Sequence, residues 1–230
     1  MSLSERRRQR CLRAIENVLK FLQRDDSARE TTKRLQERFL SPNCILEANM
    51  TALAGDILRE SDAQFLSYIP SLTRAALSGS YPPRCRLATM KAAAEYLKTL
   101  YIGVPIEQFY LLLLDASGRL IECELMQKGT LDETPFYLGH MLQSVVTANA
   151  SAVVLSHNHP GGTLRPSQAD IKCTFDALAA LYPLQVSLLD HIVIADGDAV
   201  SIRDNGFISA DLWLHQNPKS KLLRDWLLDE

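Results

Sequence analysis

Two histidines separated by one residue, with an aspartate further along, are the residues of this chain best suited to metal chemistry. The pair is His157 and His159, and the carboxylate belongs to Asp170. Imidazole and carboxylate groups are ligands that suit zinc, and three protein ligands keep a fourth position for water. An open position is typical of a catalytic rather than a structural zinc site. The spacing therefore predicts a Zn2+ site formed by His157, His159 and Asp170.

The elements that must position these side chains are a strand, a loop and a helix. Residues 151–156 form a short apolar run typical of a buried strand. Side chains two residues apart on a strand leave the same face, so the two imidazoles should point together from its C-terminal end. Residues 160–166, rich in proline and glycine, then turn the chain. A helix is expected from Ser167, with Asp170 in its first turn and able to point back at the histidines.

The same helix start has a simpler interpretation. A serine followed three residues later by an acidic residue also fits a helix capping box, in which both side chains bind backbone N–H groups. Taken alone, the spacing of Ser167 and Asp170 favours capping. The chain contains only 5 histidines, however, and two of them lie just before this segment. The combination favours a metal site.

A zinc ion at this place would support hydrolysis. Zinc lowers the pKa of its bound water toward about 7, which makes hydroxide available at neutral pH. Hydrolysis also needs a general base, for which a carboxylate is the natural choice, and a hydroxyl near the developing oxyanion would help. Ser167 is placed to supply that hydroxyl.

The composition indicates a globular protein without a membrane span. The 230 residues are 47% hydrophobic and 23% charged, with a net charge of -2, which argues against a surface that binds nucleic acid all over. No apolar run approaches the length of a membrane helix, and the N-terminus lacks the apolar segment of a secretory signal. The five cysteines are scattered without a Cys-x-x-Cys pair, so a reducing cytoplasm is the expected location.

The first third of the chain is expected to be all-α. Apolar residues recur every three or four positions over residues 3–22, and a second helix is expected over 28–39. Shorter helices are expected over 44–47, 51–58, 62–66 and 71–77. Arginines crowd the start of the first helix, at positions 6, 7, 8, 10 and 13.

Residues 79–84 (Gly-Ser-Tyr-Pro-Pro-Arg) are the expected linker, after which the pattern changes. Helices are expected over 87–101, 136–148 and 167–181, and a terminal helix over 213–228. Strands are expected over 109–114, 119–127, 152–156, 184–189, 191–195 and 199–202. This interleaving predicts an α/β (α+β) domain with a mixed sheet, and three segments overall: 1–82, 83–210 and a helical tail at 211–230.

The spacing of His157, His159, Ser167 and Asp170 resembles the JAMM signature of JAB/MPN metalloproteases. The wider segment from about residue 84 to 208 resembles the RadC family, on strings such as Ala152-Val-Val-Leu-Ser-His-Asn-His-Pro-Gly-Gly162, Pro166-Ser-Gln-Ala-Asp170 and Asp190-His191. The resemblance implies a cytidine-deaminase-like mixed sheet, zinc on the three ligands, Ser167 assisting, and a peptide or isopeptide substrate.

The resemblance also implies a catalytic glutamate near the start of the first core strand. Glu107 fits that place best, and Glu124 in the following strand is the competitor. The chain departs from the family pattern at Gly161, where serine is usual, and at Thr163, where an acidic residue is usual. These departures affect the shape of the loop rather than the ligands.

RadC-like chains usually carry a helix-hairpin-helix module before the JAB domain. Residues 68–76 stand at its expected place but lack the glycine pair that presents backbone amides to phosphate, so a degenerate module is expected. The RadC likeness and the arginine cluster make DNA the alternative partner to a peptide, although such an arginine run is more often a solvated helix end. His191 is expected to be a core residue or a partner of a metal ligand. The sequence does not predict an oligomeric state.

Overall fold

The computed structural model describes residues 3–23, 27–129, 134–160, 162–215, 217 and 220–228. The chain divides into two compact units, one of Met1–Ala76 with Ile102–Pro105, the other of Leu77–Tyr101 with Ile106–Glu230. We call them the helical unit and the α/β unit. Gly161, where the sequence departs from the family pattern, lies outside the described residues.

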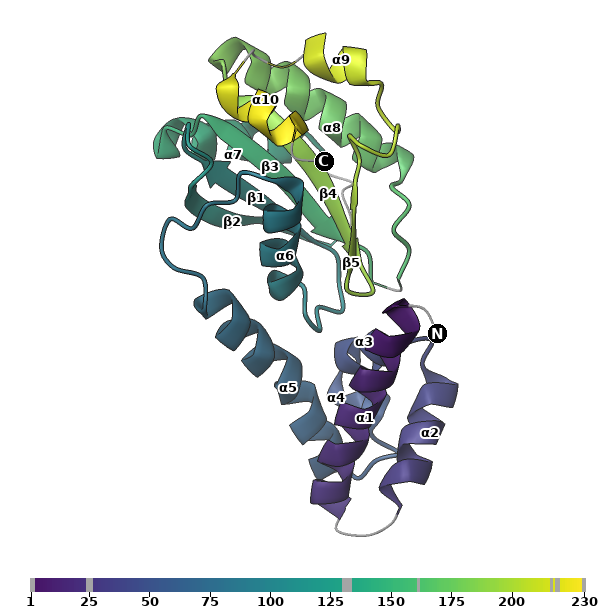
Figure 1. Ribbon diagram of the computed structural model, residues 1–230. Helices are drawn as coiled ribbons and strands as arrows, with labels where there is room; N and C mark the ends of the chain where they lie inside the picture. Colours follow the sequence, from purple (N-terminus) through teal and green to yellow (C-terminus); the bar gives the residue numbers. More distant parts are fainter. Residues whose placement is uncertain are drawn as a thin grey trace. The chain divides into compact units, whose positions relative to one another are not determined.

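The helical unit is built from α1 (Leu3–Gln23), α2 (Ala28–Arg38), α3 (Pro42–Glu47), α4 (Met50–Leu53) and most of α5 (Glu60–Gly79) (Figure 1). The expected helical character of the N-terminal region is confirmed. Its core gathers apolar side chains from all five helices, among them Ile15, Leu19, Leu35, Ile45, Leu53 and Leu66.

Two details of the expected helices were wrong. The separate helices at 62–66 and 71–77 are one helix, α5, which continues through Pro70. Proline removes one helix hydrogen bond, but Ala63, Leu66 and Pro70 are buried together at three- and four-residue spacing, so packing outweighs that loss. The helix expected over 51–58 ends at Leu53, because Gly55 takes a positive φ of 105° that a helix does not allow.

The α/β unit contains a five-stranded mixed sheet in the order β2-β1-β3-β4-β5. The strands are β1 (Gln108–Leu114), β2 (Leu120–Lys128), β3 (Ala152–Asn158), β4 (Ser187–Ala195) and β5 (Asp198–Ser201). Only the central β3 and β4 pair in parallel, and the other three pairs are antiparallel. The expected mixed sheet is therefore confirmed.

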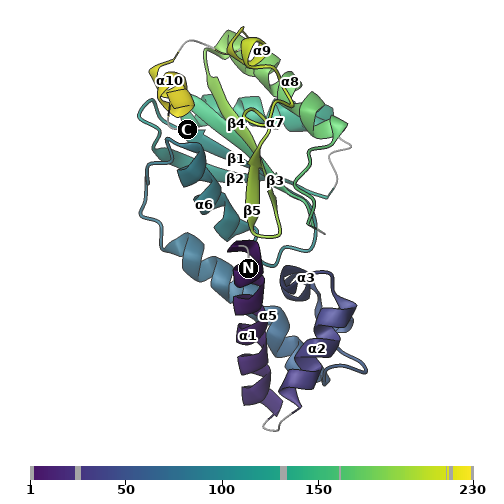
Figure 2. The same cartoon turned by 45° about the vertical axis from the view of Figure 1, so that its right-hand side comes forward.

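Helices cover both faces of this sheet (Figures 1 and 2). One face packs against α7 (Thr134–Ala148), α8 (Gln168–Leu181) and α9 (Ala210–His215), around Leu111, Val153 and Leu178. The other face packs against α6 (Met90–Leu100) and α10 (Lys221–Leu228), around Leu112 and Val154. A 3-10 turn, Tyr182–Leu184, joins α8 to β4.

The C-terminal half differs from the expected elements in two places. The strands at 184–189 and 191–195 are one strand, β4, with a register shift beside Val153 and Val154. The terminal helix is two helices, because Ser209 and Ser220 each cap a new start with a side-chain oxygen. Trp213 and Trp226 are both buried, on opposite faces of the sheet. No helix in the described part of the chain has the length and apolar character to cross a bilayer.

Candidate metal centre

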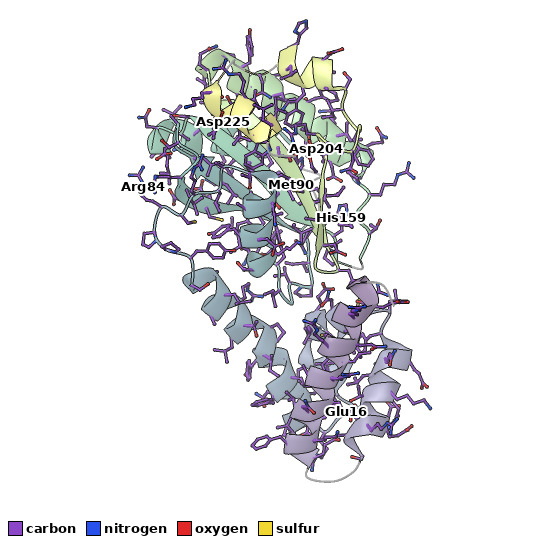
Figure 3. The ribbon with its side chains drawn as sticks, viewed as in Figure 1. Glu16, Arg84, Met90, His159, Asp204 and Asp225 are labelled. Carbon is purple, nitrogen blue, oxygen red and sulfur yellow. The ribbon has the colours of Figure 1, made fainter. Side chains whose placement is uncertain are left out.

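The C-terminal end of β3 carries both histidines. The strand runs two residues further than expected and ends at Asn158, because parallel pairing with β4 continues to Ile194. The next backbone amide, that of His159, still donates to the Ile194 carbonyl at 2.9 Å. This extended backbone turns the two imidazoles the same way, and their Nε2 atoms lie 3.0 Å apart. Figure 3 labels His159 in the α/β unit.

Asp170 completes the group from the first turn of α8. Its Oδ1 lies 3.2 Å from His157 Nε2, and its Oδ2 lies 3.6 Å from His159 Nε2. Ligands at about 2.0–2.1 Å around a tetrahedral zinc ion stand about 3.3 Å from one another. His157 Nε2 lies 3.0 Å from His159 Nε2 and 3.2 Å from Asp170 Oδ1, both close to that value. The separation of 3.6 Å at His159 Nε2 involves the other carboxylate oxygen, Oδ2. The side chains of His157, His159 and Asp170 therefore lie at separations that suit shared coordination of one zinc ion.

Asp170 also caps its own helix. Ser167 Oγ accepts the Asp170 amide at 3.1 Å, and Asp170 Oδ2 accepts the Ser167 amide at 2.6 Å. Both bonds of a capping box are thus present. The box holds the carboxylate so that Oδ1 faces His157. Capping and metal binding are compatible interpretations of the same two residues, because capping fixes the aspartate where a ligand is needed.

The hydrogen bonds behind the histidines explain which nitrogen faces the centre. His159 Nδ1 lies 2.8 Å from the carbonyl oxygen of Thr163. A carbonyl only accepts, so Nδ1 must carry the proton, and Nε2 of the neutral ring presents a lone pair. His157 Nδ1 is engaged by His191 Nε2 at 2.9 Å, which likewise turns Nε2 toward Asp170. A carboxylate and two imidazole lone pairs that converge in a buried place need a cation between them.

The electrostatics of the centre agree with this need. Burial acts to raise the pKa of Asp170. In the metal-free protein an imidazole of His157 or His159 that takes up a second proton on Nε2 hydrogen-bonds to the carboxylate, which outweighs burial and holds that pKa well below its usual range. The Asp170 carboxylate raises the pKa of His159, with smaller contributions from the Thr163 carbonyl and the charge of Glu107, while burial opposes the shift. The centre therefore attracts positive charge, whether proton or metal.

The structure separates the two candidate bases. Phe109 pairs with His157 at the end of the β1–β3 ladder, and Glu107 and His159 each lie two residues beyond that pair. The negative charge of Glu107 is the smallest of the contributions that raise the pKa of His159. Glu124 instead pairs with Leu111 on the outer strand β2, and its Oε1 lies 3.6 Å from His140. The geometry thus favours Glu107, the residue that the sequence also favoured.

Ser167 lies at the rim of the centre. Its side chain is exposed, and its oxygen accepts one backbone N–H. Because a hydroxyl both donates and accepts, the Ser167 proton can still be donated to a bound group. The structure thus brings His157, His159, Asp170, Ser167 and Glu107 to one end of the sheet.

Two residues that support the site, Asn158 and Thr174, were not predicted from the sequence. Asn158 leaves β3 on the face opposite the histidines; its oxygen accepts the Gln108 amide at 2.7 Å and its nitrogen donates to the Ile106 carbonyl at 3.1 Å. It thereby holds the backbone on both sides of Glu107. Thr174 lies one helical turn after Asp170 and contacts His191 at 2.7 Å. The alternation of the strand could have indicated Asn158. The four-residue spacing puts Thr174 on the same helix face as Asp170 but does not indicate its contact with His191.

Comparisons with known proteins agree with this architecture. Residues 87–207 match the family model described as the RadC-like JAB domain. A UPF0758 protein of Pseudomonas putida is 32% identical over 185 residues, which cover 79% of this chain and 80% of that protein. A UPF0758 protein of Chromobacterium violaceum is 34% identical, over 79% of this chain and 82% of the relative. A UPF0758 protein of Janthinobacterium is 36% identical, over 62% of this chain and 64% of the relative.

Proposed function

Because the chain belongs to the RadC family of JAB domains, we propose that it is a zinc-dependent hydrolase of the JAMM type, which cleaves a peptide or isopeptide amide. The observation that supports this proposal most is the convergence of three potential metal ligands at the end of β3. The donor atoms of His157, His159 and Asp170 all lie within 4.8 Å of one another. A zinc ion held by three protein ligands supplies Lewis acidity, which acidifies water and polarises a carbonyl.

The residues around the ligands provide the remaining chemistry of amide hydrolysis. Glu107, which lies just before β1 at the end of the sheet where β3 carries the histidines, would take a proton from the attacking water at its carboxylate and deliver it to the leaving nitrogen. Ser167 would donate its free hydroxyl proton to the oxygen that gains charge when water adds to the carbonyl carbon. The C–N bond then breaks, and the products are a carboxylate and an amine.

Hydrolysis is tested with zinc-loaded protein and a mixture of linear and lysine-isopeptide-linked peptides, with the products identified by mass spectrometry. We expect cleavage that a chelator abolishes and added zinc restores. Glu107→Gln should retain zinc and lose activity, whereas Glu124→Gln, which removes the same charge next to His140, should retain both. Activity that survives in Glu107→Gln but not in Glu124→Gln would assign the base to Glu124.

Nucleic-acid binding is a second proposal, supported by the exposure of Arg6, Arg8, Arg10 and Arg13 on α1. The segment expected to hold a hairpin, 68–76, is part of the continuous helix α5. Binding would therefore depend on arginine contacts with phosphates and should weaken steeply as salt rises. Absence of DNA binding at low salt would exclude it. We propose a reducing, cytoplasmic location, since none of the five cysteines, all of which lie in the described residues, forms a disulfide.

A further inference from the structure

We propose that Thr174 and His191 form a hydrogen-bond relay that orients the His157 imidazole for metal binding, and that the relay sets the affinity for zinc. The inference rests on the proposed zinc centre and assigns positioning roles to two residues that lie behind it. Neither residue offers an atom to the group of three ligands.

The relay is a continuous chain of short contacts that begins and ends at metal ligands. The Thr174 hydroxyl donates to the backbone carbonyl of Asp170 at 2.7 Å. The same oxygen lies 2.7 Å from His191 Nδ1. His191 Nε2 in turn lies 2.9 Å from His157 Nδ1. Two of the proposed ligands, Asp170 and His157, are therefore connected through two side chains.

The direction of every hydrogen bond follows from the first one. A hydroxyl has one proton, and Thr174 donates its proton to the Asp170 carbonyl, so its oxygen must accept from His191. His191 Nδ1 therefore carries a proton, and in the neutral ring Nε2 is left as an acceptor. His157 must then donate from Nδ1, which leaves the lone pair of Nε2 directed at Asp170. The relay selects the tautomer that can bind a metal.

A bulge in β4 brings His191 onto the correct face. Val153 pairs with Leu188, but Val154 pairs with Asp190, so one extra residue lies in β4 between these pairs. Without this residue, strict alternation would turn His191 to the face covered by α6 and α10. Asp190 stabilises the bulge because its Oδ1 accepts the His191 amide at 2.7 Å and the Ser201 hydroxyl at 2.9 Å. The side chains of the adjacent Asp190 and His191 thus lie on opposite faces of the sheet.

The relay is buried, so water cannot readily replace a hydrogen-bond partner that is removed from it. Thr174 and His191 are each 0% exposed, and His157 is 2% exposed. The ring of Phe109 stacks parallel to His157, 6.0 Å between centroids, and meets His191 edge-on at 5.4 Å. A solvent molecule cannot easily replace a lost partner in such surroundings, so removal of the Thr174 hydroxyl should free His191 to take the other tautomer.

The test compares zinc affinity in three threonine variants by chelator competition. Thr174→Val removes the hydroxyl and preserves the shape, Thr174→Ser restores the hydroxyl, and Thr32→Val is the matched control. Thr32 is also a buried helical threonine, and it donates to the carbonyl four residues earlier at 2.8 Å. We expect Thr174→Val to weaken zinc binding about 10-fold, within the range for partners of metal ligands. Thr174→Ser and Thr32→Val should bind zinc as the wild type does.

Two further measurements keep the test decisive. His191→Phe should weaken zinc binding by about 10- to 100-fold, because His157 then lacks its acceptor. In zinc-loaded wild type, long-range 1H–15N spectra should show a protonated Nδ1 on His157. Unchanged affinity in folded Thr174→Val and His191→Phe, or an unprotonated Nδ1, would overturn the relay. Absence of zinc binding by the wild type would instead overturn the proposed centre itself.

Discussion

Ser167 and Asp170 share one capping box, and substitutions at the two positions should separate capping from metal binding. Ser167→Ala removes only the bond from Ser167 Oγ to the Asp170 amide. The metal-free protein should lose about 1 kcal/mol of unfolding free energy, as for other N-cap serines, while zinc affinity stays within a few-fold of wild type. The ligand carboxylate is still held by the Ser167 amide at 2.6 Å.

Asp170→Asn should give the opposite result. The amide oxygen of asparagine can still accept the Ser167 N–H, and its NH2 can donate to the His157 Nε2 lone pair, so the metal-free protein should keep most of its stability. A neutral amide is a poor zinc ligand, and affinity should fall by more than the roughly 10- to 100-fold typical of residues behind the ligands.

The assays are urea denaturation in the presence of chelator and zinc titration by calorimetry. The two variants should have opposite effects. Ser167→Ala should lower the free energy of unfolding and leave zinc affinity nearly unchanged, and Asp170→Asn should lower zinc affinity and leave most of the stability. If Asp170→Asn binds zinc as tightly as wild type, Asp170 is only a capping residue, and the three-ligand centre is refuted.

Two other predictions concern the supports of the centre. Burial raises the pKa of Asp190 to about 7, against a usual value of 3.8, with Arg203, Ser201 and Asp204 as its neighbours. The folded state then holds a proton that the unfolded state releases, so wild-type stability should fall as pH rises from about 4 to 7. The free energy of unfolding of Asp190→Asn, relative to that of wild type, should therefore increase by at most about 4 kcal/mol across that window. Urea denaturation at several pH values measures this difference, and a difference that does not change with pH would contradict the raised pKa of Asp190. Asn158→Ala leaves the Gln108 N–H and the Ile106 carbonyl without their partner, which should cost about 1–3 kcal/mol in the same assay; a loss under 0.5 kcal/mol, on the order of an ordinary surface substitution, would show that the clamp is unimportant.

Local patterns in the sequence predicted the parts of this protein that depend on neighbouring residues. The alternation of a strand and the start of a helix were enough to bring His157, His159 and Asp170 to one place, because each element positions its own side chains. The mixed sheet followed from the interleaving of apolar runs. The preference for Glu107 over Glu124 came from the family resemblance and stays a prediction; the pairing of Phe109 with His157 puts Glu107 at the end of the sheet that carries the ligands.

The errors arose where tertiary packing decides. Pro70 ends a helix by local rules, yet α5 continues because one face is buried. Asp190 resembles a break between strands, yet a bulge carries β4 past it, and only the pairing with β3 shows this. The relay through Thr174 joins a helix to a strand 17 residues further along the chain, so local spacing could not reveal it.

The zinc content of the purified protein tests the central claim most directly. Wild-type protein expressed with ample metal and freed of loosely bound ions should contain close to one zinc ion per chain by mass spectrometry of the metal. His159→Ala removes one of the three converging ligands and should contain almost none. Wild-type protein that folds normally but contains no zinc, and takes up none on titration, would contradict the account.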